Sequence, residues 1–248
     1  MISVLIIAKN EEDVIGDAIK SVRELADEVV VIDGGSEDKT VEIAEKLNAR
    51  VVKNKFKDFS DQRNLAASVA KGDILFYLDS DEQATPEFIK ELKERIDLNP
   101  DAAGFYVHRK TFYYGKDWHF EDRVERVFHK RKLKEWYGVV HETPKVDGEL
   151  VDIFEPILHY THRNFEQMIA KTNEWSEYEA ELRFRSHHPK MNIWRFPRVM
   201  ITAFFGSYFS GGGWRNGTAG IVEATYQMYS MFLTYAKLWE LQNKMANN

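Results

Sequence analysis

Two carboxylates, Asp79 and Asp81, stand two positions apart directly after the apolar run 74–78. Neither carboxylate can enter a protein core without a partner, because burying an unpaired charge is very unfavourable. A divalent cation would offset their mutual repulsion, and hard oxygen ligands suit Mg²⁺ or Mn²⁺ bound together with phosphate oxygens. A solvated turn is the plain alternative. The pair therefore indicates either a metal–phosphate site or an exposed turn.

Asp33 stands in the same relation to an earlier apolar run, 28–32, and is followed by Gly34, Gly35 and Ser36. Its carboxylate could accept a hydrogen bond from a ribose or a base N–H, and the glycines would let the ligand approach the backbone closely. Ser36 has the residue type of a helix N-cap. An ordinary strand-to-helix turn would have the same sequence.

The first hundred residues alternate short β-branched runs with amphipathic helical patterns, which predicts βαβ units and a mainly parallel sheet covered on both faces. In such sheets ligands bind beyond the carboxyl ends of the strands. Polar clusters follow three of the predicted strands, at 9–12, 33–36 and 79–82, so we expect them to meet in one crevice. We predict strands at 2–8, 28–32, 50–53 and 74–78, and helices at 13–25, 36–47 and 60–70 and from Thr85 onward.

The pattern changes after residue 100. Strands are predicted at 103–110, 124–128 and 156–160, and helices at 164–185, 193–209 and 219–242. Ser210, Gly211, Gly212 and Gly213 are interpreted as a hinge between the last two helices.

The composition excludes several classes of protein. The 248 residues are 44% hydrophobic and 30% charged, which is globular, and contain no cysteine, which excludes a disulfide framework and a thiol nucleophile. A formal net charge of −6 argues against nucleic-acid binding. We find no signal peptide and no apolar run long enough to span a bilayer, and therefore expect a cytoplasmic protein.

The ordered segments 7–12, 29–40, Gln62-Arg63-Asn64 and 72–82 together resemble the inverting family 2 glycosyltransferases, and within them the bacterial lipopolysaccharide inner-core glucosyltransferases. The segments beginning at Arg126 and Gly138, Leu158-His159 and the stretch 212–217 also resemble that group. The resemblance implies a GT-A-type α/β fold with a catalytic domain at 1–160, made of a nucleotide-binding half (1–100) and an acceptor half (101–160). Residues 161–248 would form a helical extension.

The resemblance also implies a reaction and its ligands. A sugar would pass with inversion from a nucleotide-diphosphate donor, a UDP-sugar, to a hydroxyl of a glycan or glycolipid in the synthesis of lipopolysaccharide core or another cell-surface glycan. A divalent cation, Mg²⁺ or Mn²⁺, would bind Asp81 and bridge the diphosphate. Nucleotide-binding roles are implied for Ala8, Asn10, Glu11, Asp33, Gln62, Asn64 and Asp79.

Inversion needs a base on the face of the sugar opposite the leaving diphosphate. Glu142 is our candidate because a carboxylate is the usual base in the family, with His141 orienting the loop or a substrate. Glu125 and Asp122 are the alternatives. Arg126 would clamp a phosphate or the acceptor, or else form a surface ion pair.

Two features leave alternatives open. His159 is either a further metal ligand or a hydrogen-bonded structural histidine. Residues 187–222 contain four Lys or Arg, several aromatics and no Asp or Glu, which suits either an anionic membrane surface or burial in a homo-oligomer.

Other functions fit less well. A phosphatase of the haloacid-dehalogenase type also uses Asp-x-Asp, but Gln83 stands where that class has Thr or Val. A nucleotidyltransferase would need a glycine-rich phosphate loop after the first strand. A non-catalytic nucleotide-sugar-binding protein of the same fold would not need to keep Asp33, Asp79 and Asp81 together.

Overall fold

The parallel half of the main sheet is built by the β-branched runs of the first eighty residues. The computed structural model describes residues 1–138 and 142–244. Strands β1 (Ile2–Ala8), β2 (Glu28–Asp33), β3 (Arg50–Lys53) and β4 (Ile74–Asp79) pair in parallel in the order β3-β2-β1-β4. The prediction of four parallel strands in this region is confirmed.

The other half of the sheet contains antiparallel strand pairs. In the described residues the sheet continues from β4 through β7 (Lys116–His129), β6 (Gly104–Tyr113) and β10 (Leu150–Thr161) to the two-residue strand β5 (Glu82–Gln83). β7 runs antiparallel to β4, and β5 antiparallel to β10. A separate sheet of β8 (Leu133–Tyr137) and β9 (Thr143–Val146), which the sequence patterns did not predict, lies in the same part of the chain.

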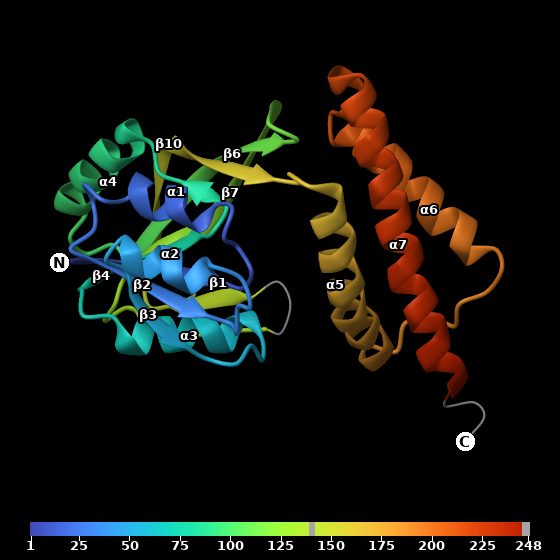
Figure 1. Cartoon of the computed structure of the whole chain (residues 1–248), viewed down its shortest axis with the longest axis horizontal. Helices are drawn as coiled ribbons and strands as arrows, with labels where there is room; N and C mark the ends of the chain where they lie inside the picture. Colours follow the sequence, from blue (N-terminus) through green and yellow to red (C-terminus); the bar gives the residue numbers. More distant parts are fainter. Residues whose placement is uncertain (139–141, 245–248) are drawn as a thin grey trace. The chain divides into compact units, whose positions relative to one another are not determined.

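Helices cover both faces of the parallel strands, as predicted (Figure 1). α1 (Ile15–Ser21), α2 (Thr40–Lys46) and α4 (Pro86–Leu98) pack on the face that carries Val4 and Ile6, and α3 (Phe59–Val69) packs on the face that carries Leu5. Alternate residues of β1 therefore enter two separate apolar layers, as the period of a strand requires. Both layers are buried, which explains the continuous apolar runs in the sequence.

Helix starts were predicted with mixed success. Thr85 caps α4 as expected, because its hydroxyl accepts a hydrogen bond from the Phe88 N–H at 3.1 Å and Pro86 opens the helix. The assignment of Ser36 as the cap of the second helix is wrong, since α2 begins at Thr40. The Ser36 hydroxyl instead accepts from the Asn10 N–H at 2.9 Å, which holds the residues before α2 in a loop.

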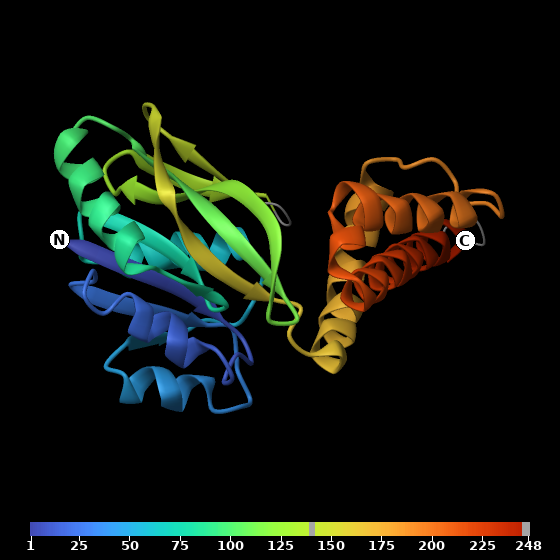
Figure 2. The ribbon, with the colours of Figure 1, turned by 90° about the horizontal axis from the view of Figure 1, so that it is seen from above.

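Tertiary contacts divide the chain into two compact units. The first comprises Met1–Thr111 and Glu121–Tyr160, and the second, the helical unit, comprises Phe112–Phe120 and Thr161–Asn248. The turn between β6 and β7 thus belongs with the helices, although it lies far from them in the sequence. Figure 2 shows the elements of both units from a second direction.

The helical unit contains α5 (Phe165–Arg185), α6 (Arg195–Phe205), a π-helical turn (Gly206–Ser210), a 3-10 turn (Gly213–Asn216) and α7 (Thr218–Lys244). Ala180, Met191, Tyr235 and Leu238 form its buried core. Within the described part of the chain, no helix is both long enough and apolar enough to cross a bilayer. Of the predicted glycine hinge, Gly213 packs closely against α7: a Cβ on Gly220 would lie 1.8 Å from the carbonyl oxygen of Gly213.

Candidate active site

The strand register brings the predicted site residues to one edge of the sheet. Ala8, the last residue of β1, pairs with Asp33, the last residue of β2, and its neighbour Ile7 pairs with Asp79 at the end of β4. β1 lies between β2 and β4, so the polar segments that follow the three strands start side by side. This is the crevice expected at the carboxyl ends of parallel strands.

The loops after β1 and β2 are tied to each other. The buried carboxylate of Asp33 accepts hydrogen bonds from the N–H groups of Gly35 and Ser36. The Asn10 side-chain oxygen accepts from the Glu37 N–H at 2.8 Å, and the Glu11 N–H donates to the Thr40 hydroxyl at 2.8 Å. Ala8, Asn10, Glu11 and Asp33 therefore build one rigid corner. Their predicted contact with a nucleotide stays a prediction.

Asp79 is enclosed by arginines. Arg63, whose side chain is only 5% exposed, donates to one oxygen of Asp79 at 3.1 Å, and Arg126 donates to the other. Burial by itself raises the pKa of this carboxyl, but the charges of Arg126, Arg63 and Arg109 outweigh burial and hold the pKa of Asp79 well below its usual range. Asp79 is therefore a neutralised carboxylate that fixes two guanidinium groups.

Glu82 completes this network beneath the crevice. Its fully buried carboxylate accepts from the Asp79 N–H at 2.9 Å and from Arg109 at 3.0 Å, and Arg126 lies 3.4 Å away. Arg109 also pairs with Asp122 through two hydrogen bonds. The first and fourth residues of the segment 79–82, Asp79 and Glu82, therefore have arginine partners, whereas the third, Asp81, has none among the described residues.

Asp81 has a different environment from Asp79. Among the described residues, the charged partner of its carboxylate is His159, with Oδ2 and Nε2 3.6 Å apart, and the Asp81 side chain is 21% exposed. Burial by itself lowers the pKa of His159. The hydrogen bond to Asp81 and the charge of Asp81 outweigh burial, so the pKa of His159 is raised above its usual value. The other ring nitrogen of His159 lies 3.5 Å from the Thr111 hydroxyl, which orients the ring.

This donor set fits a divalent cation. No described group of three or more His, Cys, Asp or Glu side chains is arranged to hold a metal by itself. A carboxylate and an oriented imidazole, with further oxygens supplied by a diphosphate, are suitable ligands for Mn²⁺ or a similar ion. Of the two acids, Asp81 is the one that forms no ion pair with the arginines of the described structure and so is available to bind a cation. This agrees with the metal-binding role predicted for Asp81 from the sequence.

Glu142 contacts the same guanidinium as Asp79. Arg63 donates through Nε to Glu142 at 2.8 Å while its terminal nitrogen binds Asp79, and the guanidinium lies 4.8 Å from the ring centroid of Trp136. The candidate base therefore lies at the carboxyl end of β4. His141, expected to orient this loop, lies outside the described residues.

The alternative bases are less well placed. Side chains alternate between the faces of a strand, so Glu125 of β7 points to the opposite face from Arg126 and hence away from Asp79. Asp122 shares the face of Arg126, but both of its oxygens are used by Arg109. These positions favour Glu142, whose role as the base stays a prediction.

Gln62 and Asn64 have structural partners. Gln62 is fully buried and donates to the carbonyl of Asn54 at 3.2 Å. The amide of Asn64 donates to the Trp136 carbonyl at 2.9 Å and accepts from the Trp136 N–H at 2.8 Å, so it holds β8 against α3. The predicted contact of these two amides with a nucleotide stays a prediction.

Sequence reasoning did not select Arg63, Arg109 or Glu82. Arg63 stands between the two amides of a motif that was noted, yet it carries the central ion pairs. Its position offered one signal: an arginine on the apolar side of an amphipathic helix must find carboxylate partners. Arg109 had no such signal, because its partners come from β5 and β7.

Known proteins similar to this chain identify its family. Residues 3–146 match the model of glycosyl transferase family 2, and a glycosyltransferase of Rickettsia bellii is 31% identical over 97% of this chain and 86% of its own. This chain belongs to glycosyl transferase family 2. Another relative, the lipopolysaccharide core biosynthesis glycosyltransferase LpsC of Rhizobium meliloti, is 26% identical over 96% of this chain and 92% of its own.

Among solved structures, this family 2 chain is similar to a glucosyl-3-phosphoglycerate synthase from Mycobacterium tuberculosis in complex with Mn²⁺ and UDP-glucose, with 21% identity, a TM-score of 0.48 and coverage of 77% of this chain and 80% of that one. The family match covers β1 to β9, including Asp81 and Glu142, and ends before β10, which carries His159. The predicted family and its GT-A-type α/β fold are confirmed. Helices α5, α6 and α7 lie beyond the matched residues.

Proposed function

We propose that this glycosyltransferase moves a sugar, with inversion, from a UDP-sugar to an acceptor hydroxyl, and that it depends on a divalent cation. The observation that carries the proposal is the unequal treatment of the two acids: Asp79 is neutralised by Arg63 and Arg126, whereas Asp81 faces His159. In such a site Asp79 has a structural role and Asp81 is available to bind a cation. Glu142 pairs with Arg63, the arginine that also binds Asp79, at the carboxyl end of β4.

Each group then has a defined task. The cation held by Asp81 and His159 would supply positive charge to the diphosphate as it leaves. Glu142 would accept the proton of the acceptor hydroxyl, and Arg63 would hold Glu142 in position. Asp79 keeps Arg63 and Arg126 fixed before the substrate arrives, which is the preorganisation that electrostatic catalysis requires.

The acceptor is proposed from the relatives. LpsC is named for the biosynthesis of lipopolysaccharide core, and it aligns over nearly the whole of this chain. We therefore propose a cell-surface glycan or glycolipid, such as the lipopolysaccharide core, as the acceptor.

A panel of nucleotide sugars tests the donor. In the presence of Mn²⁺, a UDP-sugar should raise the melting temperature, because a ligand that binds the folded state alone stabilises it by about 2.7 kcal/mol at a hundred times its Kd. Slow release of UDP from the same sugar should accompany binding. Binding of a donor without any UDP release or transfer, with each sugar of the panel, would favour the non-catalytic alternative.

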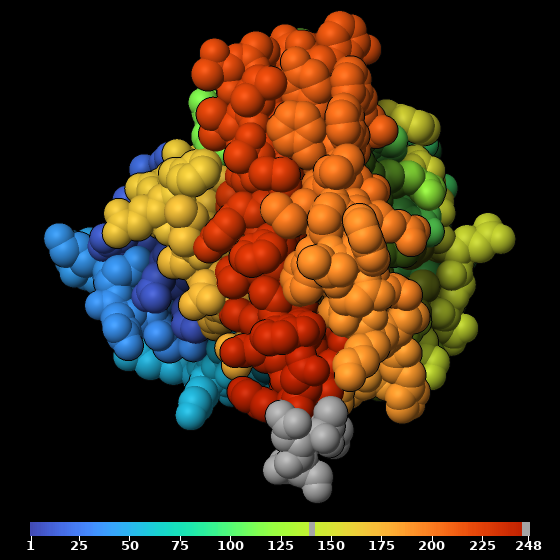
Figure 3. All heavy atoms as spheres, turned by 90° about the vertical axis from the view of Figure 1, so that its right-hand side faces the viewer, coloured from blue at the N-terminus to red at the C-terminus, as the bar shows by residue number. Residues whose placement is uncertain are grey.

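We also propose that the enzyme works on the inner face of the cytoplasmic membrane. Trp194, Ile201 and Phe205, spaced seven and four residues apart along α6, are 80%, 53% and 51% exposed. This spacing places them on one side of the helix. Figure 3 shows α6 and α7 side by side on this surface of the helical unit. Aromatic and apolar side chains next to basic ones suit an anionic lipid surface.

Vesicle sedimentation tests this surface. The double variant Ile201→Ser/Phe205→Ser should bind phosphatidylglycerol vesicles at least tenfold more weakly, because burying each large apolar side chain is worth about 1.5–3 kcal/mol. Leu98→Ser, at an apolar position on α4 that is even more exposed (76%), is the control and should bind normally. Wild-type protein that ignores the vesicles but self-associates until Ile201 and Phe205 are replaced would assign the surface to an oligomer.

A further inference from the structure

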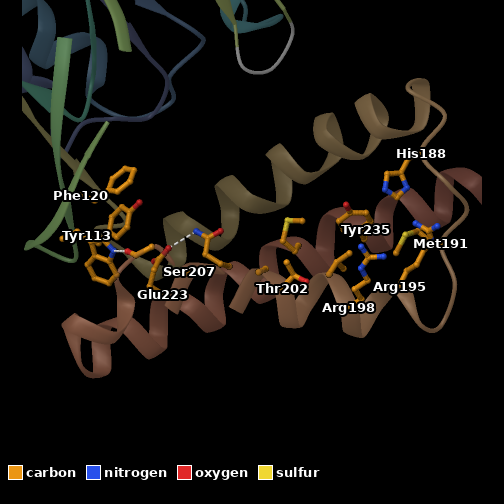
Figure 4. A pocket seen from close by; sticks show the side chains of 16 residues that line it. Tyr113, Phe120, His188, Met191, Arg195, Arg198, Thr202, Ser207, Glu223 and Tyr235 are labelled. Atoms are coloured by element: carbon orange, nitrogen blue, oxygen red, sulfur yellow. Dashed lines mark hydrogen bonds between the residues drawn. The ribbon is translucent and has the colours of Figure 1, made fainter. Parts of the chain in front are cut away.

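The helical unit contains a pocket that is lined by none of the residues of the candidate active site. It has a volume of about 630 Å³ and lies between α6, α7 and the turn that joins β6 to β7. Its length is visible in Figure 4, with Tyr113 and Phe120 at one end and His188 and Arg195 at the other. Its size is within the range of about 300–1,000 Å³ that is typical of small-molecule sites.

One end of the pocket is cationic. Arg195 is half-buried and Arg198 lies one turn further along α6, and both line the pocket. Within residues 1–138 and 142–244, no acidic side chain forms an ion pair with either arginine. A half-buried guanidinium without a counter-charge favours an anionic ligand, and two neighbouring guanidinium groups suit a phosphate.

At the opposite end of the pocket, the charged group already has its hydrogen-bond partners. The buried carboxylate of Glu223 accepts hydrogen bonds from Tyr114 and Gln227 and lies 2.8 Å from His162 Nδ1. Burial raises the pKa of Glu223, but its bonds to His162, Gln227 and Tyr114 keep it lower than usual. A second anion is therefore unfavourable at this end, so an anionic ligand would bind in one direction only.

The stretch between the two ends is mainly apolar. Val199, Ala203, Met231 and Tyr235 line it. The span from Arg195 to Ser207 along the helix is roughly 18 Å at 1.5 Å per residue. One leaflet of a bilayer holds hydrocarbon chains about 15 Å long. Methionine side chains adapt readily to a flexible chain.

We propose that this pocket binds one hydrocarbon chain of a phosphate-bearing lipid. The phosphate is held by Arg195 and Arg198, and the chain extends along α6 toward Trp118. Trp118 is buried at the far end, where its indole N–H donates to the Gly211 carbonyl at 2.9 Å. The pocket lies wholly within the helical unit, so this proposal is independent of the proposed transferase reaction and is tested without any sugar donor.

Tryptophan fluorescence of the full chain tests the proposal with a single-chain lipid. Lysophosphatidic acid with a brominated acyl chain, kept below its micelle concentration, should quench the emission that Trp118→Phe removes, because bromine quenches an indole only at close range. Arg195→Gln and Arg198→Gln should each raise the half-quenching concentration about tenfold, as expected for the loss of a charge-assisted hydrogen bond. Arg215→Gln, an exposed arginine that does not line the pocket, should leave it unchanged.

Several outcomes would overturn the proposal. Equal quenching by a brominated monoacylglycerol, which has no phosphate, would show that the arginines do not select the anion. Competition by glycerol phosphate at the same concentration as the lipid would assign the site to a free phosphate. The same loss in Arg215→Gln as in Arg195→Gln would indicate a nonspecific charge effect. Ala203→Phe should block quenching by filling the middle of the pocket without adding an indole; if it instead abolishes self-association and the lipid never quenches, the pocket is an interface between copies.

Discussion

Replacing Asp81 by Ala should lower turnover by about 10³-fold or more while the protein stays folded, because the diphosphate loses the charge that stabilises its departure. Asp81 has His159 as its charged partner in the described structure, so its removal strands no arginine. Initial rates with Mn²⁺ and Mg²⁺, with the melting temperature measured in parallel, check this expectation. The wild-type enzyme should lose activity in excess chelator, and full activity there would refute metal dependence.

The neighbouring acid provides a sharp contrast. Asp79→Ala leaves Arg63 and Arg126 without one of their partners in a buried site, which should reduce the free energy of unfolding by about 3 kcal/mol. Asp73→Ala, at the other end of β4 and largely exposed, should change neither stability nor rate. Asp79→Ala is thus expected to reduce folding stability, whereas Asp81→Ala is expected to reduce turnover.

Replacing Glu142 by Gln should reduce the rate by about 10²–10⁴-fold with donor binding nearly unchanged, which is the contribution of a well-placed general base. The amide keeps the shape of the side chain and still accepts a hydrogen bond from Arg63 through its oxygen, but it cannot take the acceptor's proton. Single-turnover rates and donor titrations separate the chemical step from binding.

Glu125→Gln is the matched control, since Glu125 carries the same group on the opposite face of β7 from Arg126. It should have almost normal activity. Normal turnover by Glu142→Gln together with an inactive Glu125→Gln would show that the base lies on β7 and that Glu142 only positions Arg63.

Local sequence signals were sufficient for most of the fold around the site. The apolar runs of β1, β2 and β4 are buried on both faces and alternate with amphipathic helices, so strand type and parallel pairing follow from short-range patterns. Thr85 and Pro86 specify a helix start by themselves. The start of α2 was misjudged because Ser36 is engaged by Asn10, a residue 26 positions earlier. The strands β8 and β9 were missed because they are short and half-exposed.

The sequence alone determined the family, the order of the motifs that follow the parallel strands, and the residues at which those strands end. These features depend on the periodicity of hydrophobic residues and on residues that are close along the chain. Only the tertiary structure decided how the charges are shared. Arg63, Arg109 and Arg126 come from α3, β6 and β7, and they meet Asp79 and Glu82 through contacts across 16 to 47 positions. The difference between Asp79 and Asp81 arises from these contacts, because the role of a carboxylate depends on its neighbours in space. The spacing of the two acids within the motif does not encode those neighbours.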